Sequence, residues 1–481
     1  MQCSPNGRNC STSDFSAHQQ NPMISKDLSH EFASYISTCR FEDLPSDAIE
    51  AAKKSILDVL GVCLAASGTV PAIQSVIELV RDSGGKPECT VLGFHDRVPP
   101  LMAAFANGAM AHCLDFDDMG PDGNHSSSYL IPAVFAAAEH VGGVSGKQLI
   151  TSVAIGQDLF FRIRRSLQQR LDWLVTTVLG VFSATAGVSY VLRLSEEQIV
   201  NALGIASLGS CGTLEMRFGT DSDLGELYAG FVAKSAVLSA LLAHKGVTGT
   251  QSVFEGKAGV MNVYFQGEYD RARILDELGR RFEGSTIQYK PWPTCGISHT
   301  YIHATLELIR KHELNASDIA EIRPFVGDFA QQMCYPLEAR RSPASAMDAR
   351  FSLPFSLAAA AVYGAVRIGQ FATDGLRDSA VLAAAQKVVP VNDASFDWKG
   401  DMPNARVDIL MKSGEVLTGF GDGTPGGKDR PMDWNLIAGK FSECASLAAN
   451  PVNPDVIARV VKMAESLEQL DDSTNLIRAL A

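Results

Sequence analysis

The amino-acid sequence predicts a mainly α-helical protein that is interrupted in its second half by a smaller α+β segment. Long stretches between Ser46 and His244 carry apolar residues at the spacing of helices. Residues 405–411 alternate between apolar and polar side chains, as a half-buried strand does, and residues 321–326 form a second candidate strand. Beyond a loop rich in Gly and Pro at residues 421–434, helical spacing returns.

The helices expected in the first half are rich in Ala, Gly and Ser. Small side chains let neighbouring backbones approach closely, and the apolar residues extend round much of each helix. We therefore expect core helices of a large bundle. Asp47 and Glu50 favour the start of the first helix, and Gly68 favours its end. The expected ranges are 46–67, 101–113, 129–141, 146–167, 178–192, 195–207 and 227–244.

The second half of the chain mixes helical and strand patterns, and the change begins near Gln288. The candidate strand at residues 405–411 continues through Ser413 and Gly414 into residues 415–419, which is typical of a hairpin. The expected helices of this half are 299–314, 353–365, 435–448 and 454–470.

The composition is that of a globular protein with ample material for a core. The chain has 481 residues, a formal net charge of −13 and 46% hydrophobic side chains. Nucleic acids and anionic membranes bind basic surfaces, so neither is an expected partner. No run of 18 apolar residues occurs, and we expect no membrane-spanning helix. The ten cysteines include no Cys-x-x-Cys pair, so we expect reduced thiols. Residues 1–26 are polar and carry no apolar core of a signal peptide, so we expect a disordered tail there. Both observations favour a cytoplasmic protein.

A cluster of titratable residues lies between two expected helices, at residues 112–128. Its members are His112, Asp115, Asp117, Asp118 and His125. Three carboxylates within four residues repel one another, so some of them need a partner or a ligand. A His beside carboxylates titrates near neutral pH, so the cluster suits acid–base chemistry. The alternative interpretation is structural: Asp117 and Asp118 cap a turn, and His125 is a solvated loop residue. The spacing matches no recognised metal-binding motif, so no metal is expected.

Two further groups of residues carry charge that a ligand could use. Asp158, Arg162 and Arg165 share one face of a helix, and an internal ion pair between Asp158 and Arg162 is the favoured role. The alternative is that Arg162 or Arg165 binds a substrate carboxylate through two parallel hydrogen bonds. Arg217 and Lys290 are other possible suppliers of positive charge.

The last group of interest is the extended segment at residues 289–299. Two prolines fix its conformation, and it carries Lys290, Cys295 and His299 at the junction between the helical and α+β regions. Clefts between domains are favoured ligand sites. The alternative is a structured linker in which Cys295 is a buried thiol.

The order of several motifs resembles the MmgE/PrpD family from about Asp27 onward. The motifs are HCLDFDD with His125, GQDLFFRI (156–163), GVFSATAG (180–187), LYAGFVAKSAVLSALLA (227–243), YKPWPTC (289–295), DARFSLPFSLA (348–358) and PMDWNLIAGKF (431–441). The resemblance implies a large all-helical domain at residues 27–284 and 426–481, with a smaller α+β lid domain at residues 285–425 inserted into it. It also implies an active site in the cleft, a homodimer, and no metal or organic cofactor.

The family's catalytic positions carry over in part. Asp115, His125 and Lys290 match residues of the cis-aconitate decarboxylases in this family. Met119 stands where a Thr is usual, whereas Tyr228 and Cys295 each stand where a His is usual.

The resemblance therefore implies a lyase without cofactors, of dehydratase or decarboxylase type, which moves a proton next to a carboxylate or carbonyl of a small carboxylate. His125, oriented by Asp115, is the expected base, and Lys290 the expected electrostatic anchor. Two alternatives are an epimerase or isomerase with two opposed acid–base residues, and an inactive binding homologue. The remaining candidates are Tyr228 and Cys295 as proton donors, and Arg162, Arg217, His112 and Met119 as substrate-binding residues.

Overall fold

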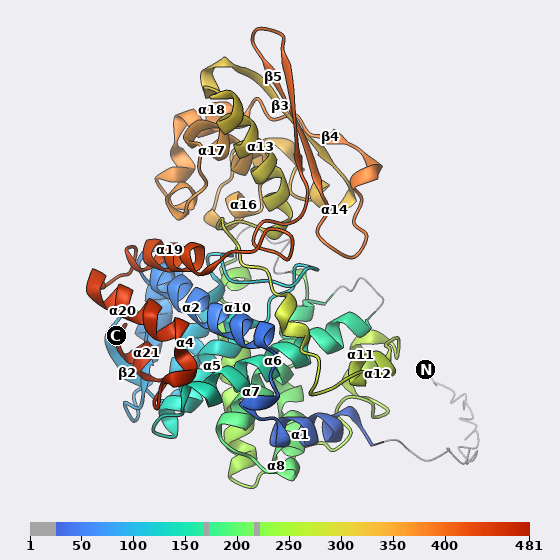
Figure 1. Cartoon of the computed structure of the whole chain (residues 1–481), viewed down its shortest axis with the longest axis vertical. Coiled ribbons are helices and arrows are strands. Elements are labelled where there is room, and N and C mark those ends of the chain that lie inside the picture. The colour runs from blue at the N-terminus through green and yellow to red at the C-terminus, as the bar shows by residue number, and fades with distance from the viewer. Residues whose placement is uncertain (1–25, 168–172, 216–221) are drawn as a thin grey trace, which may run out of the picture.

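The computed structural model describes residues 26–167, 173–215 and 222–481, and it is mainly α-helical. A large helical body lies below a smaller body that holds a sheet, with the C-terminal helices back on the large body (Figure 1). Each body has its own hydrophobic core. Buried side chains from residues 28–289 and 432–480 form nearly all of the first, and those from residues 297–417 form the second. The expected tail at residues 1–26 lies, except for Lys26, outside the described residues.

The helices of the large body match the sequence expectation closely, with ends displaced by up to three residues. They are α2 (Ser46–Thr69), α4 (Pro100–His112), α5 (Ser127–His140), α6 (Gly146–Ser166), α7 (Val175–Val191), α8 (Glu196–Ala206) and α10 (Leu224–His244). The sequence reading did not anticipate α1 (Leu28–Thr38), α3 (Ala72–Asp82), α11 (Val260–Phe265), α12 (Arg271–Leu275) and the β1–β2 hairpin (Cys89–Val91, Asp96–Val98).

Small residues allow the two most extensively packed helices, α4 and α10, to approach closely. A Cβ atom added to Gly108 of α4 would lie 2.9 Å from the Cα of Gly230 on α10. Among the described helices, α10 alone is long and apolar enough to cross a membrane. Helices α2 and α3 would make a second candidate only if the pair, which is bent by 98°, were counted as one span. In the most apolar window of α10, 56% is buried inside the protein, as is usual for a core helix.

The smaller body is built on a four-stranded sheet of order β4-β3-β5-β6. Strand β3 (Ile319–Val326) pairs antiparallel with β5 (Ala405–Met411), which forms the expected hairpin with β6 (Val416–Gly421), whereas β4 (Val391–Asn392) pairs parallel with β3. The helices of this body are α13 (His299–His312), α14 (Asp328–Gln331), α15 (Leu337–Arg341), α16 (Ala346–Arg350), α17 (Leu353–Tyr363) and α18 (Ser379–Ala385). Of these, α13 packs on β5 and β6.

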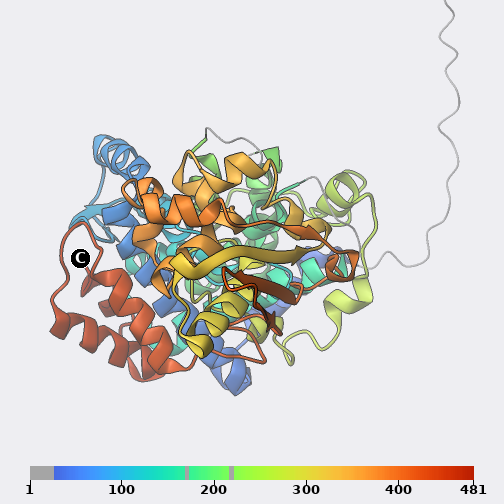
Figure 2. The same cartoon turned by 90° about the horizontal axis from the view of Figure 1, so that it is seen from above.

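The chain returns to the large body through α19 (Trp434–Ala445), α20 (Pro454–Glu465) and α21 (Asn475–Arg478). Helices α19 and α20 pack on α2, and both views show these red helices beside the blue N-terminal ones (Figures 1 and 2). One contact of this return reaches the loop after α4, because Lys440 donates to the Phe116 carbonyl at 2.6 Å. The C-terminal part of the chain thus supports this loop, which carries the candidate site.

Candidate active site

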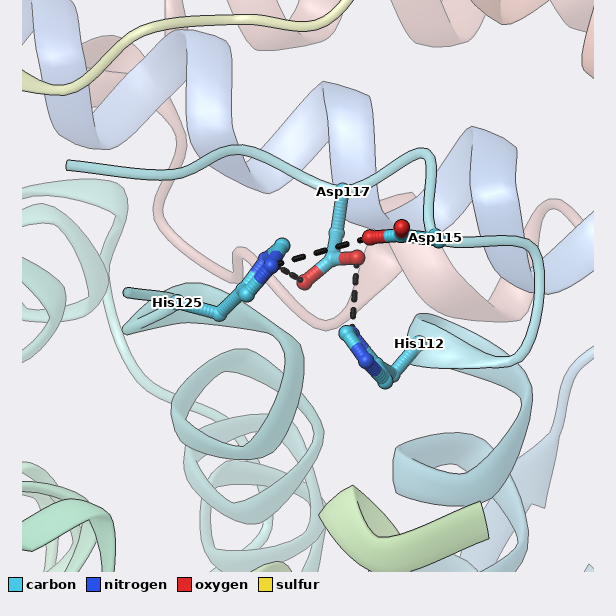
Figure 3. A group of neighbouring side chains, drawn as sticks. All are labelled: His112, Asp115, Asp117 and His125. Atoms are coloured by element: carbon cyan, nitrogen blue, oxygen red, sulfur yellow. Dashed lines mark hydrogen bonds and ion pairs between the residues drawn. The ribbon is translucent and has the colours of Figure 1, made fainter. Parts of the chain in front are cut away.

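The loop at residues 113–126 joins α4 to α5 and gathers the titratable cluster predicted from the sequence (Figure 3). His112 is the last residue of α4, and Asp115 adopts a left-handed backbone conformation with φ of 47°, which Asp tolerates better than most residues. All five members of the cluster are buried. The solvated-loop alternative is therefore wrong for His125, which is 4% exposed.

The Asp117 carboxylate connects the two imidazoles of the cluster (Figure 3). Its Oδ1 lies 2.9 Å from Nδ1 of His112, and its Oδ2 lies 2.9 Å from Nδ1 of His125. Burial alone would raise the pKa of Asp117, but the two imidazoles outweigh that effect and hold the pKa well below its ordinary value. Asp117 is therefore a permanently charged acceptor at neutral pH.

The contacts of His125 define its tautomer. Its Nδ1 faces two acceptors, the Asp117 carboxylate and the Asp118 carbonyl oxygen at 2.8 Å, so Nδ1 carries the proton. Burial lowers the pKa of His125 and outweighs the opposite effect of Asp117, so the neutral ring is favoured. Nε2 is then an available lone pair, as a general base requires. Asp115 lies 3.7 Å from Nε2, whereas the shorter contacts of the ring are those of Nδ1 with Asp117 and Asp118. The geometry therefore favours these two residues over Asp115 as the groups that orient the ring.

Asp115 is instead the partner of Lys290. The buried Lys290 ammonium lies 2.5 Å from Oδ1 of Asp115 and donates to its backbone carbonyl at 2.9 Å. An antiparallel bridge between Met119 and Gln288 fixes the extended segment beside the loop and so places Lys290. Burial raises the pKa of Asp115, but Lys290 and the two imidazoles leave it lower than usual.

A cavity of about 220 Å³ lies between the two bodies, next to this pair. Asp115, His125 and Lys290 line it from the large body and the extended segment, and Met119 lines it as well. Cys295 also lines the cavity and is partly exposed, so the fully buried thiol that the sequence allowed is not observed. The structure therefore brings five of the nine predicted site residues to one cavity.

Tyr228 and His112 do not line this cavity. The Tyr228 ring packs against His112 with centroids 4.4 Å apart, and His112 in turn packs against His125 at 4.7 Å. Tyr228 lines a separate, largely apolar cavity together with Leu208 and Phe231. The expectation that Tyr228 donates a proton to the substrate is thus not supported by its position, and His112 acts on His125 only through Asp117 and ring packing.

Arg162 does not reach the cavity either. It is 1% exposed, pairs with Asp158 at 2.8 Å, and donates to the backbone carbonyls of Ile274, Asp276, Glu277 and Arg281. The internal ion pair that the helical spacing favoured is confirmed. The substrate-binding role is not supported by this position, because the donors of Arg162 are already occupied. Arg217 lies outside the described residues, so its role stays a prediction.

Two arginines of the cavity wall were missed in the sequence. Arg164 lies on α6 beside the Arg162 that was singled out, and pairs with Asp122 at 2.9 Å. Arg340 comes from α15 in the smaller body. Helical spacing could not have identified Arg340, because α15 has only five residues and no apolar periodicity.

The cluster also places four potential metal ligands close together. One atom each from His112, Asp115, Asp117 and His125 lies within 4.8 Å of all the others. The sequence spacing gave no hint of this proximity. Two contacts oppose an ion here, because the Lys290 ammonium already supplies a positive charge to Asp115 and both Asp117 oxygens already face imidazole nitrogens.

Comparison with known proteins identifies the class to which this fold and site belong. The model of the MmgE/PrpD N-terminal domain matches residues 30–272, and that of the MmgE/PrpD C-terminal domain matches residues 292–465. This chain therefore belongs to the MmgE/PrpD family, and it is an enzyme.

Its relatives are named for two reactions. The chain is 26% identical to a cis-aconitate decarboxylase of Aspergillus terreus, over 94% of this chain and 95% of the relative. It is 24% identical to the cis-aconitate decarboxylase of Homo sapiens, over 95% of each. It is 22% identical to a 2-methylcitrate dehydratase of Salmonella typhimurium, over 78% of this chain and 80% of the relative.

Proposed function

We propose that this enzyme is a lyase of dehydratase or decarboxylase type that acts on a small carboxylate without a metal or organic cofactor. One observation carries the proposal: Nδ1 of His125 faces two acceptors, which favours the tautomer with an unprotonated Nε2, at the wall of a cavity that also contains Lys290. Relatives named as decarboxylases and a dehydratase support the reaction type.

The proposed chemistry is proton transfer at a carbon next to a carboxylate or carbonyl. In dehydration, Nε2 of His125 takes the proton from this carbon, the double bond forms, and the hydroxyl leaves as water after receiving a proton from a donor. In decarboxylation, carbon dioxide leaves and the electron pair left on carbon takes up a proton. In both, charge develops on the carboxylate or carbonyl oxygens, and the buried Lys290 ammonium favours that charge.

The decisive experiment follows mass and isotope together. Wild-type enzyme and His125→Ala are incubated with small carboxylates in heavy water, and the products are analysed by mass spectrometry and proton NMR. A loss of water or carbon dioxide that His125→Ala slows by about 10²–10⁴ supports the proposal. Unchanged mass and no proton exchange with any substrate, or full activity of His125→Ala, would refute it.

Cys295 favours an epimerase or isomerase as the second candidate. It reaches the cavity from the start of a short helix in the smaller body (Gly296–Ser298), whereas His125 comes from the large body. Two acid–base groups from opposite bodies could act on the two faces of one carbon. Exchange of the substrate proton for deuterium without loss of water or carbon dioxide would support this candidate over the lyase.

We also propose that residues 285–425 form a lid domain over a helical domain at residues 27–284 and 426–481. The cavity supports this arrangement, since both parts contribute to its wall. The link between them includes a hydrogen bond from the Met402 amide to the Pro121 carbonyl at 3.1 Å.

We propose further that the enzyme is a homodimer in the cytoplasm. Leu224, Phe231 and Leu238 are spaced by seven residues on α10, and each is more than 40% exposed. An apolar stripe of this kind on a helix is typical of a surface that a second copy covers. None of the described cysteines forms a disulfide, which supports a reducing compartment. Phe231→Asp should shift the mass measured by light scattering from dimer to monomer, and an unchanged mass would refute this interface.

A further inference from the structure

The wall of the candidate cavity is dominated by apolar side chains, several of them large. They come from both bodies and include Met119, Trp173, Phe329, Phe351, Trp398 and Met402. Two of these rings, Phe329 and Trp398, pack against each other with centroids 5.7 Å apart. A ligand made only of carboxylates and hydroxyls would leave much of this wall against polar groups. The wall therefore favours a ligand with an apolar part.

The charges of the same wall are almost all paired. Among the described residues that line the cavity, the cations are Lys290, Arg164 and Arg340. Lys290 lies 2.5 Å from Asp115, and Arg164 lies 2.9 Å from Asp122. Each pair brings a carboxylate that would repel an anionic ligand, so these two cations offer little net positive charge.

Arg340 is different from the other two cations. No carboxylate within ion-pair distance of it occurs among the described residues, and its one hydrogen bond from the guanidinium goes to the Gln332 carbonyl at 3.2 Å. Its Nε is buried and has no hydrogen-bond partner in the described part of the chain. The rest of the side chain is half-buried, but a buried Nε–H donor without an acceptor is costly unless a ligand supplies one. A carboxylate fits its fork geometry best.

We propose that the substrate is a carboxylate with a single anionic group, bound at Arg340, and a bulky aromatic or branched apolar group that lies against the Trp and Phe side chains. This inference rests on the proposed function for the reacting site but concerns a different part of the cavity. With the one carboxylate at Arg340, the group beside His125 and Lys290 is the carbonyl that the proposed function allows. It separates this enzyme from relatives named for cis-aconitate, which carries three carboxylates. A second and third carboxylate would have no unpaired cation on the described wall, and desolvating them there is unfavourable.

Binding can be tested without catalysis. Calorimetry compares 3-phenylpropanoate, which has one carboxylate and an aromatic ring, with propane-1,2,3-tricarboxylate, on the full-length protein. We expect 3-phenylpropanoate to bind at least tenfold more tightly. Arg340→Gln should weaken it by about 10- to 100-fold, the loss of a charge-assisted hydrogen bond, and Arg340→Lys should weaken it less. The matched control is Arg310→Gln, since Arg310 is 77% exposed on α13 and pairs only with Glu307 among the described residues.

Each outcome decides the matter. Tighter binding of the tricarboxylate, no measurable binding of 3-phenylpropanoate, or equal binding by wild type and Arg340→Gln would overturn the inference. The same titration on His125→Ala separates the two proposals. If His125→Ala binds 3-phenylpropanoate normally while wild type transforms no carboxylate, the substrate class stands and the proposed function fails. If wild type transforms tricarboxylates alone, the function stands and the substrate class fails.

Discussion

Asp117→Asn is the substitution that tests the site most directly. The carboxylate now lies 2.9 Å from Nδ1 of both imidazoles. His112 is hydrogen-bonded to its Oδ1, whereas Nδ1 of His125 is hydrogen-bonded to the Asp118 carbonyl and makes a charge contact with Oδ2. An Asn side chain has the same shape but one oxygen and one NH₂ group, so it can accept from only one ring. At the other ring the NH₂ group meets an N–H donor, which favours moving that ring's proton to the other nitrogen. If the ring is His125, the Asp118 carbonyl still accepts from Nδ1, so the substitution weakens the preference for an unprotonated Nε2 without removing it.

The loss in kcat should stay below the roughly 10⁴ that a complete change of tautomer causes where a carboxylate orients a catalytic His. It should still exceed about tenfold, because the neutral amide no longer stabilises the imidazolium that forms when His125 takes up a proton. Stability should also fall, by about 1.5–3 kcal/mol for one charge-assisted hydrogen bond between buried groups. The assay combines kcat, the melting temperature, and the ¹⁵N chemical shifts of the imidazoles, which distinguish the two tautomers.

Asp118→Asn is the matched control for Asp117→Asn. Asp118 is the next residue and is equally buried, but its carboxylate accepts from Ser55 at 2.5 Å, and only its backbone carbonyl faces His125. Activity of the control should stay within about tenfold of wild type. If Asp117→Asn retains wild-type kcat and tautomer, or if both variants lose activity equally, the assignment of Asp117 as the group that positions His125 is wrong.

Three further outcomes follow from the geometry. Burial, reinforced by Asp58, raises the pKa of Asp118 to about 7, so the folded state keeps a proton that the unfolded state releases above about pH 4. The free energy of unfolding should therefore fall as the pH rises from 4 to 7. Denaturation of Asp118→Asn should lack this pH dependence. Lys290→Met should lower activity and also destabilise the fold by about 3–5 kcal/mol, because the buried Asp115 carboxylate loses its partner. The double variant Lys290→Met, Asp115→Asn should regain stability but not activity. Exhaustive chelation should leave the rate unchanged, and recovery by an added divalent ion would show that the four clustered ligand atoms hold a metal.

Much of the fold could be predicted because its signals are local. The long helices of the large body carry continuous apolar surface and small residues, and α4, α6 and α10 were found within three residues of their ends. The β5–β6 hairpin was found from alternation and a Gly turn. The short strand β4 was not, because its pairing with β3 is parallel and brings together residues more than 60 positions apart.

The candidate site was predicted in its residues more than in its geometry. His125, Asp115 and Lys290 could be named, but which carboxylate orients the His depends on backbone angles that a sequence does not display. Asp115 turns away at its positive φ and meets Lys290, whereas Asp117 faces the rings. Arg340 could not be found at all, because it reaches the cavity from a five-residue helix of the other body.

Cys295 separates the two candidate reactions, because it is the cavity residue that the smaller body offers opposite His125. It lines the cavity, is partly exposed, and is fixed by a hydrogen bond from its amide to the Arg350 carbonyl at 3.1 Å. Cys295→Ala removes the thiol without disturbing that backbone contact, so the melting temperature should not change. If the thiol is the opposing acid, this variant loses net turnover yet still exchanges the substrate proton next to the carboxylate through His125 in heavy water. Full turnover by Cys295→Ala would show that the thiol takes no part and that the donor of the second proton is another group.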